Sequence, residues 1–210
     1  MDKKVENLLF DLGGVIMDIR RQNAVDALSR LGMRDADELL GDYVQNGIFR
    51  SLEEGNLSPE GFTDAVRNYF PDNGRGITDR QIDEAFMKFL VGIPKERLRA
   101  LEQLHRDYGI YMLSNTNVIM WEGEIKDDFT VDGHDIDYYF DGIVTSFEAG
   151  AVKPEPEIFR YTIEKLGIDP STTLFLDDSQ ANLAAAAKFG FQTLHVPSDQ
   201  EFMPLLKCRL

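Results

Sequence analysis

The fold is decided by the stretch Asn7-Leu-Leu-Phe-Asp11-Leu-Gly-Gly14 near the start of the chain. A short apolar run that ends in an acid and a glycine pair predicts a buried strand stopping at a turn. Four more apolar runs predict strands of the same kind: Ile110–Ser114, Gly142–Ser146, Thr173–Asp178 and Phe191–Val196. Segments with helical periodicity separate these runs, which indicates an α/β protein with a mostly parallel sheet covered on both faces.

Helices with clear end signals are expected between the later strands. The ranges Pro94–Tyr108, Pro156–Leu166 and Ala181–Phe189 place apolar residues at helical spacing, and each is followed by a glycine. A glycine there is typical of a C-terminal cap, because it adopts the left-handed conformation without strain. The connection at residues 121–142 is acidic, and we expect a solvated loop there, with an edge of the active site or a contact surface as the alternatives.

A long insertion is expected after the first strand. About 95 residues separate the first two strands, far more than one crossover needs. Ser58-Pro59 is typical of a helix start, and Thr78 with Gln81 is typical of a capping box. Helices are predicted at Asn23–Leu31, Asp37–Phe49, Pro59–Phe70 and Asp79–Leu90. We therefore expect an all-helical insertion at residues 19–92 and a core formed by residues 1–18 and 93–210.

The composition excludes several classes of protein. The chain has 210 residues, of which 43% are hydrophobic, and a formal net charge of −15. This apolar content is untypical of a disordered chain, and the acidic balance argues against nucleic acid and anionic membranes as partners. The single cysteine, Cys208, excludes an intrachain disulfide, and the mixed charges at the start argue against a signal peptide. We expect a cytoplasmic protein.

Two of the predicted strands end in acids. Asp11 ends the first strand, and the pair Asp177 and Asp178 ends the fourth. Ligands of open parallel sheets bind beyond the carboxyl ends of the strands, so neighbouring strands would bring these carboxylates to one spot. Such a cluster repels itself and needs a cation, and an oxygen-only ligand set favours Mg²⁺. The alternative is that the acids only cap the helices that follow.

Two further side chains extend this cluster into a candidate site for phosphoryl transfer. Ser114 ends the second strand, where its hydroxyl and the adjacent backbone N–H groups can bind an anion. Lys153 precedes a predicted helix and offers a positive charge. Each is ordinary alone, because Ser-Asn is common in turns and most lysines are solvated. Together with the strand-end acids, they supply a nucleophile, phosphate ligands, a fixed cation and Mg²⁺ ligands.

At these positions the sequence resembles the haloacid dehalogenase (HAD) superfamily, and most of all its helical-cap branch of α-D-glucose-1-phosphatase-like and epoxide-hydrolase-N-domain-like phosphatases. The resemblance covers nearly the whole chain and implies a Rossmann-like α/β fold with strand order 5-4-1-2-3 and an inserted α-helical cap. The matching segments are Leu9-Phe-Asp11-Leu-Gly-Gly-Val-Ile16, Leu113-Ser-Asn-Thr-Asn117, Val152-Lys-Pro-Glu155, Phe175-Leu-Asp-Asp-Ser-Gln-Ala-Asn182 and, in the cap, Glu54-Gly-x-Leu57-Ser58-x-Glu60-x-Phe62.

The resemblance also implies a role for each site residue. Asp11 would attack phosphorus and form an aspartyl-phosphate, which water then hydrolyses. Ser114 and the Asn115 backbone would hold the phosphoryl oxygens, and Lys153 would neutralise charge between nucleophile and phosphate. Asn182 would orient the metal-binding loop, or is a surface residue early in a helix. The implied Mg²⁺ ligands are the carboxylates of Asp11, Asp177 and Asp178 and the backbone carbonyl of Gly13. The implied substrate is a small phosphorylated metabolite such as a sugar phosphate.

One position departs from the family pattern. Phosphatases of this family usually carry a second Asp two residues after the nucleophile, and here that position is Gly13. The second Asp protonates the leaving group, and losing a general acid costs about 10²–10⁴ in rate. The first explanation is a leaving group that departs without a proton from the protein. The second is that Asp18, His134 or a cap residue supplies the proton instead. The third explanation is slow turnover in a protein that binds phosphorylated ligands more than it hydrolyses them.

The missing Asp also leaves other hydrolases as alternatives. Metal-independent haloalkanoate dehalogenases lack it as well, but Asp177 and Asp178 would repel their carboxylate substrates. Phosphonate hydrolases need a cap lysine for a Schiff base, and the solvated face of a predicted helix explains Lys88. The sequence therefore favours a phosphatase, with a dehalogenase or a weakly active phosphate-binding protein as the alternatives.

Overall fold

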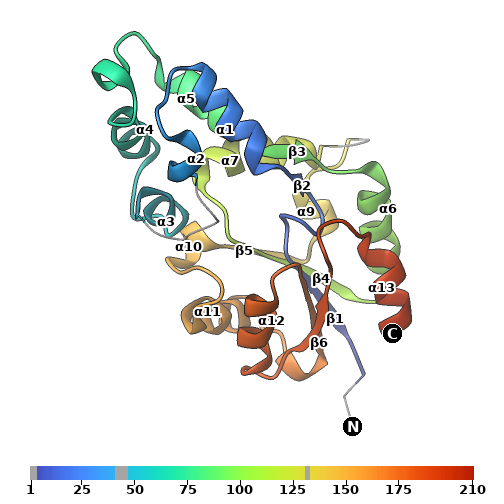
Figure 1. Cartoon of the computed structure of the whole chain (residues 1–210). Helices are drawn as coiled ribbons and strands as arrows, with labels where there is room; N and C mark the ends of the chain where they lie inside the picture. Colours follow the sequence, from blue (N-terminus) through green and yellow to red (C-terminus); the bar gives the residue numbers. More distant parts are fainter. Residues whose placement is uncertain (1–3, 41–46, 131–132) are drawn as a thin grey trace.

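The structure is a computed structural model that describes residues 4–40, 47–130 and 133–210. Its centre is a five-stranded parallel sheet in the order β5-β4-β1-β6-β7 (Figure 1). The strands are β1 (Asn7–Phe10), β4 (Gly109–Ser114), β5 (Gly142–Thr145), β6 (Thr173–Asp177) and β7 (Gln192–His195). Numbered first to fifth along the chain and read from the β7 edge, they lie in the predicted order 5-4-1-2-3. The α/β class and the five strands predicted from the sequence are confirmed.

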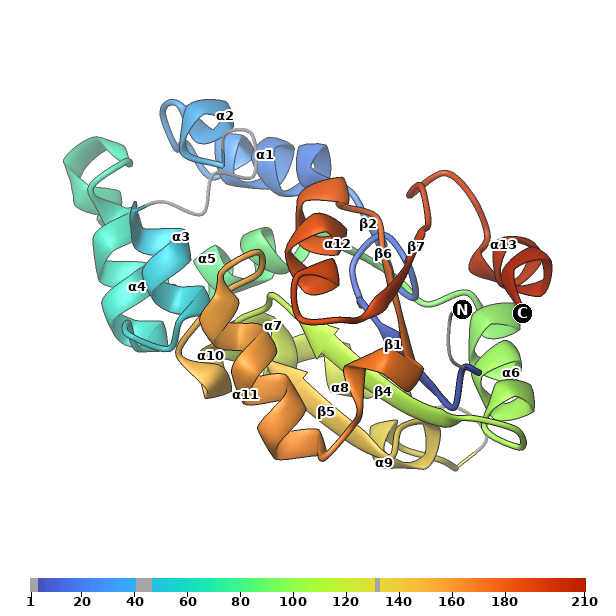
Figure 2. The same ribbon diagram turned by 90° about the horizontal axis from the view of Figure 1, so that it is seen from below.

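The side chains of the central strand β1 enter two separate apolar clusters, because successive residues of a strand point to opposite faces. Leu8 and Phe10 pack on one face, under α6 and α13. Leu9 packs on the other face, under α11 and α12 (Figure 2). These covering helices are α6 (Lys95–Leu104), α11 (Pro156–Leu166), α12 (Gln180–Ala187) and α13 (Phe202–Arg209). Apolar side chains therefore cover both faces of β1. The polar residue that follows the strand, Asp11, lies at the carboxyl edge of the sheet.

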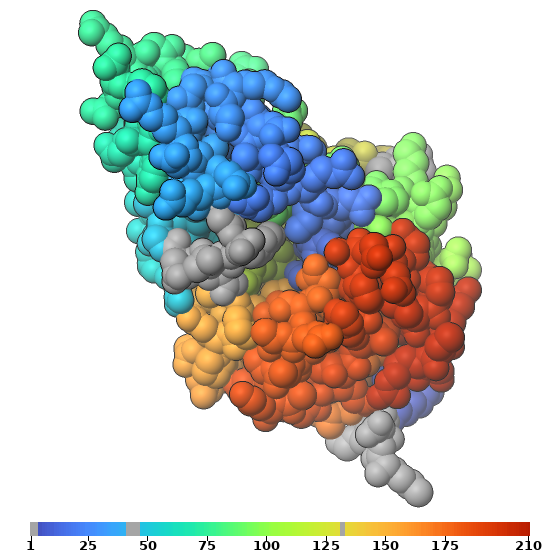
Figure 3. Space-filling view, in the orientation of Figure 1, coloured from blue at the N-terminus to red at the C-terminus, as the bar shows by residue number. Residues whose placement is uncertain are grey.

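The helices within residues 21–87 form a group beyond one edge of the core, at the upper left of Figure 1. They are α1 (Arg21–Arg30), α2 (Ala36–Leu39), α3 (Gly47–Glu53), α4 (Pro59–Arg67), a 3-10 helix at Pro71–Gly74 and α5 (Asp79–Met87). A two-stranded antiparallel sheet of β2 (Asp18–Ile19) and β3 (Leu90–Gly92) connects this group to the core. In the space-filling view the blue-to-green helices form a lobe above the orange and red part of the core (Figure 3).

The helix starts predicted in the inserted group are confirmed. The Ser58 side chain accepts a hydrogen bond from the Gly61 N–H at 3.1 Å, with Pro59 as the first helical residue. Thr78 and Gln81 form the reciprocal capping box at the start of α5. These signals act within one helical turn, so the local sequence suffices to specify them.

Three helix predictions in the inserted group are wrong in extent, and the first of them, Pro59–Phe70, ends at Arg67 in α4. The predicted helix Asp37–Phe49 does not run through Leu40, where the backbone leaves the helical region (φ −79°, ψ 1°) and α2 ends. Residues 41–46 of that prediction lie outside the described residues, and α3 begins at Gly47. The predicted helix Asp79–Leu90 ends at Met87, because Leu90 pairs with Ile19 in the antiparallel connection.

The connection after β4 is helical where a solvated acidic loop was expected. A continuous helical stretch comprises α7 (Val118–Met120), a π-helix at Trp121–Ile125 and α8 (Lys126–Asp128). Trp121, Ile125 and Phe129 are buried, at 8% exposure or less, because they recur at helical spacing among the acids. The remaining short elements are α9 (Ile136–Tyr139), α10 (Ser146–Ala149) and a 3-10 helix at Pro170–Thr172. Within the described ranges, no helix is long and apolar enough to cross a membrane.

Candidate active site

The carboxyl ends of three neighbouring strands bring predicted site residues together. Asp11 follows β1, Ser114 ends β4 and Asp177 ends β6, and β1 lies between the other two strands. Asp178 completes the group, and one carboxylate oxygen of each of the three acids lies within 4.8 Å of the others. The parallel register of the sheet therefore produces the carboxylate cluster predicted from the strand ends.

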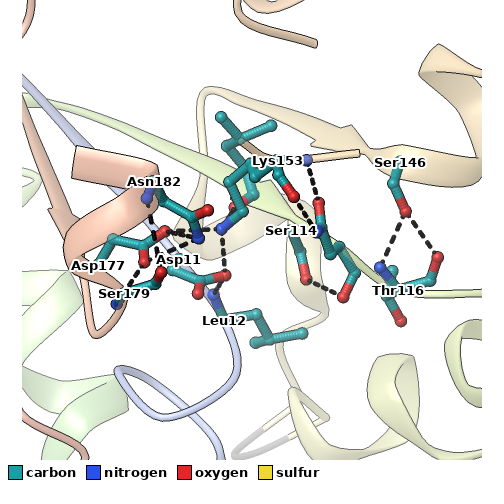
Figure 4. Close-up of polar contacts among 11 residues, drawn as sticks. Asp11, Leu12, Ser114, Thr116, Ser146, Lys153, Asp177, Ser179 and Asn182 are labelled. Atoms are coloured by element: carbon teal, nitrogen blue, oxygen red, sulfur yellow. Dashed lines mark hydrogen bonds and ion pairs between the residues drawn. The ribbon is translucent and has the colours of Figure 1, made fainter. Parts of the chain in front are cut away.

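Lys153 enters this cluster from the loop before α11 and is 1% exposed. Its Nζ lies 2.8 Å from Asp11 Oδ1 and 2.8 Å from Asp177 Oδ2 (Figure 4). It also donates to the Leu113 carbonyl at 3.1 Å. Burial disfavours the charged ammonium, but the two carboxylates outweigh burial and raise the pKa of Lys153 above its usual value. The site therefore holds a permanent positive charge beside Asp11.

Asp177 is fully buried, and donors surround its carboxylate. The Ser179 N–H donates to Oδ1 at 2.8 Å, and Asn182 Nδ2 donates to both oxygens at 3.0 and 3.1 Å. With Lys153, these donors occupy the acceptor positions of the carboxylate. Asn182 thus orients Asp177, and Asp177 is better placed to hold Lys153 than to bind an ion with a free oxygen.

Two neighbouring residues, a glycine and a histidine, fix the position of Asp178. Gly14 has φ +79°, and a Cβ at this position would collide with the Asp178 carboxylate. Glycine accepts both that conformation and that close approach. On the other side, His195 Nε2 lies 2.9 Å from the backbone oxygen of Asp178. The sequence carries no local signal for this contact of His195, which follows from its register opposite Asp177 in the β6–β7 pair.

The surroundings of Asp11 oppose its ionisation when no cation is bound. Burial raises the pKa of Asp11 to about 7; Lys153 lowers it, and the charges of Asp177 and Asp178 raise it. The Leu12 N–H, at 2.7 Å, and Lys153 both bind Oδ1. These contacts leave Oδ2 as the oxygen that can attack a substrate.

The donor set fits a hard divalent cation. Burial and the adjacent Asp177 carboxylate also raise the pKa of Asp178. The ionised form of a second acid in the cluster is therefore disfavoured when no cation is bound. Carboxylate oxygens at this spacing, with no His or Cys among the clustered ligand residues, suit Mg²⁺. Asp11, Asp178 and the Gly13 carbonyl, which belongs to the turn after Asp11, are the oxygens that would hold it, with Asp177 behind them.

Side chains that sequence reasoning did not use fix the loop after β4. Ser146 Oγ accepts from the Thr116 N–H at 3.0 Å and donates to the Thr116 carbonyl at 2.8 Å. The Asn115 side chain makes two hydrogen bonds to the main chain of Lys153. Asn117 caps α7 by accepting from a backbone N–H of its first turn. The predicted phosphate-binding loop is therefore rigid before any ligand binds.

A cavity of about 580 Å³ opens beside the cluster, between the inserted helices and the carboxyl edge of the sheet. The core contributes Gly13, Ser114 and Asn115 to its wall, and α3 contributes Phe49 and Glu53. Met120 and Ile125 also line it, so the helix after β4 forms an edge of the site, which was one of the alternatives for that connection.

Two residues considered as replacements for the missing general acid have other contacts. Asp18 Oδ1 forms an ion pair with Arg97 at 2.8 Å. His134 stacks on Tyr138 with ring centroids 3.6 Å apart. Within the described part of the chain, neither residue lines the cavity.

Comparison with known proteins identifies the family. The model of the family "haloacid dehalogenase-like hydrolase" matches residues 5–190. The chain therefore belongs to the haloacid dehalogenase-like hydrolases, and the resemblance inferred from its motifs is confirmed.

Similar proteins cover nearly the whole chain. A D-ribitol-5-phosphate phosphatase from Bacteroides thetaiotaomicron is 36% identical over 189 residues, which is 90% of each protein. A crystal structure of a HAD family enzyme from the same organism, in complex with magnesium and inorganic phosphate, is similar with a TM-score of 0.89 and 35% identity. That alignment covers 96% of this chain and 98% of the other. An (S)-2-haloacid dehalogenase from Burkholderia cepacia is 26% identical, over 94% of this chain and 87% of its own length.

Proposed function

We propose that this protein is a Mg²⁺-dependent phosphatase that hydrolyses a small phosphorylated metabolite through an aspartyl-phosphate on Asp11. The observation that carries the proposal is the buried contact of Lys153 with both Asp11 and Asp177, beside Asp178. One ammonium does not balance three carboxylates, so the site favours a divalent cation and then a phosphate. The similarity to a phosphatase and to an enzyme with bound magnesium and phosphate supports the same reaction here.

Each residue of the site has its own role in the proposed reaction, and its position sets that role. When bound, Mg²⁺ supplies a Lewis acid that neutralises charge on the phosphoryl oxygens. Asp11 Oδ2 attacks phosphorus, while Lys153 holds Oδ1 and keeps the carboxylate oriented. Ser114 and the Asn115 N–H hold the transferring group at the end of β4. Water then hydrolyses the aspartyl-phosphate and restores Asp11.

We further propose that residues 19–92 are a helical cap on a core of residues 1–18 and 93–210. The antiparallel pair β2–β3 lies at both ends of this segment, where a connection between two bodies is expected. Helix α3 contributes to the cavity wall opposite Ser114 and Asn115. Closure of the cap would exclude bulk water from the phosphoryl group during transfer.

A polyol phosphate or sugar phosphate is the substrate class we propose. A cavity of about 580 Å³ is large enough for such a molecule and lies beside the phosphate-binding loop. The phosphatase relative acts on D-ribitol-5-phosphate. Small-molecule binding also agrees with the −15 net charge, because only a local site has to attract the anion.

The test is a screen for phosphate release over polyol, sugar and small-metabolite phosphates, with and without Mg²⁺. We expect Mg²⁺-dependent release that Asp11→Asn abolishes. Unchanged activity in Asp11→Asn would contradict the covalent mechanism. Halide release from a 2-haloacid in the presence of EDTA would favour the dehalogenase alternative, and ligand binding without any phosphate release would favour a binding protein.

A further inference from the structure

We infer that Glu53 is the general acid and base of this site, in place of the carboxylate that is absent at Gly13. The inference rests on the proposed phosphatase function and assigns its proton transfers to a residue of the inserted helices. Glu53 ends α3 and lines the same cavity as Gly13, Ser114 and Asn115. Glu53 therefore shares its cavity with the residues that would hold the phosphate, and it lies near enough to Lys153 for the two charges to interact.

Two contacts, one before and one after Glu53, fix it against the core. Arg50, one helical turn earlier, pairs with Glu54 at 2.6 Å and also with Glu155 of the core, two residues beyond Lys153. Gly55 approaches the backbone of α10 so closely that a Cβ there would lie 2.5 Å from the Phe147 carbonyl oxygen. Figures 1 and 2 show α3 beside α10.

The Glu53 carboxyl does not stabilise the fold through a polar contact in the described part of the chain. It forms no hydrogen bond and no ion pair there, whereas its neighbour Glu54 is engaged with Arg50. Burial raises the pKa of Glu53 to about 7, the charge of Lys153 lowers it, and Glu54 raises it further. Asp35 and Glu38 line the same cavity and add negative charge. A carboxyl near half-protonation at neutral pH can both give and take a proton.

The proton transfers balance over the two half-reactions. In the first, Asp11 Oδ2 forms a bond to phosphorus, the ester P–O bond breaks, and the leaving oxygen takes the proton of Glu53. In the second, the Glu53 carboxylate takes a proton from water while the water oxygen bonds to phosphorus. The bond between phosphorus and Asp11 then breaks, which releases phosphate and restores Asp11 as a carboxylate and Glu53 as an acid.

The backbone does not require glycine at position 13. Lack of space therefore does not explain why a carboxylate is absent there. The nearest atom to a Cβ at Gly13 is Ile19 Cδ1, at 3.4 Å, which is an ordinary contact distance. With an acid supplied by α3, proton transfer becomes possible only when the inserted helices are docked on the core. Hydrolysis would then be coupled to closure.

The experiment compares Glu53→Gln with the unmodified protein, both with Mg²⁺, on two substrates of different leaving groups. We expect kcat/KM for D-ribitol 5-phosphate to fall by about 10²–10⁴, because an alkoxide needs a proton to depart. With p-nitrophenyl phosphate, whose leaving group needs no proton, Glu53→Gln should release about one equivalent of nitrophenol per enzyme in a burst and then turn over slowly. Glu60→Gln, an exposed acid of α4, is the matched control and should behave as the unmodified protein.

The outcomes separate this inference from the proposed function. Activity of Glu53→Gln equal to that of the unmodified protein on both substrates, without a burst, overturns the inference alone. An unmodified protein that releases no phosphate overturns the proposed function and the inference with it. The double variant Gly13→Asp with Glu53→Gln should regain alkyl phosphate hydrolysis. Loss of inorganic phosphate binding in Glu53→Gln, with no rescue by Gly13→Asp, would show a structural role and overturn the inference.

Discussion

Asn115 holds the main chain of Lys153 through both ends of its amide. Its Nδ2 donates to the Lys153 carbonyl at 3.0 Å, and its Oδ1 accepts from the Lys153 N–H at 2.8 Å. The two residues lie 38 positions apart in the chain. The loop after β4 and the segment that carries Lys153 are thus held together, so a shift of one shifts the other.

Asn115→Ala should lower kcat/KM for phosphate release by about 10²-fold, because Lys153 then loses its main-chain restraints and a displacement of about 1 Å costs that much. Asn115→Asp keeps the acceptor for the Lys153 N–H and should lose less. The measurement is steady-state kinetics of the three proteins with Mg²⁺. Equal kcat/KM in all three would show that Lys153 is held by its ion pairs alone.

Lys153→Met should lower the free energy of unfolding by about 3 kcal/mol, because it leaves two buried carboxylates without their cation. Urea denaturation without Mg²⁺ measures this loss. Lys165→Met is the control, since Lys165 pairs with Glu148 at the surface, where such pairs contribute about 1 kcal/mol or less. Equal losses in the two variants would contradict the buried-pair argument.

Mg²⁺ should raise the melting temperature more at pH 8 than at pH 5. The pKa of Asp11 is about 7 in the folded protein without cation, above its ordinary 3.8. Between these values the unfolded chain has lost a proton that the folded chain keeps, so stability falls as pH rises through this window. Mg²⁺ offsets the repulsion of the ionised cluster at pH 8, whereas at pH 5 it must first displace the proton. Scanning calorimetry checks this, and equal shifts at both pH values would contradict it.

Gly14→Ala should weaken Mg²⁺ binding by about 10- to 100-fold, as expected for a change that displaces a metal ligand. The alanine would be strained at φ +79° and would push the Asp178 carboxylate away. Gly13→Ala has room for its methyl group and should fold with an unchanged melting temperature. Isothermal titration with Mg²⁺ and thermal unfolding distinguish the two positions. Unaffected Mg²⁺ binding in Gly14→Ala would argue against Asp178 as a ligand.

Signals that act over a few residues were predictable from the sequence. The helix α11 has its predicted bounds, from Pro156 to Leu166, because a proline start and a glycine end are local devices. The capping box at Thr78 is local in the same way. The helix predicted across Leu40 failed because helical spacing alone does not reveal where a chain turns to pack on a neighbour. The helix after β4 was missed because its acids masked the burial of Trp121 and Ile125.

The strands, their polar ends and the resemblance to the family follow from the amino-acid sequence. Neighbouring parallel strands that end in Asp11, Ser114 and Asp177 bring these side chains to the same edge of the sheet. The contacts that support those residues depend on the tertiary structure. The amide of Asn115 on Lys153, the ring of His195 on the backbone of Asp178, and the placement of Glu53 over the cavity join segments far apart in the chain. Periodicity in the sequence shows which face of a helix or strand is buried, but it does not show which distant side chain lies against that face.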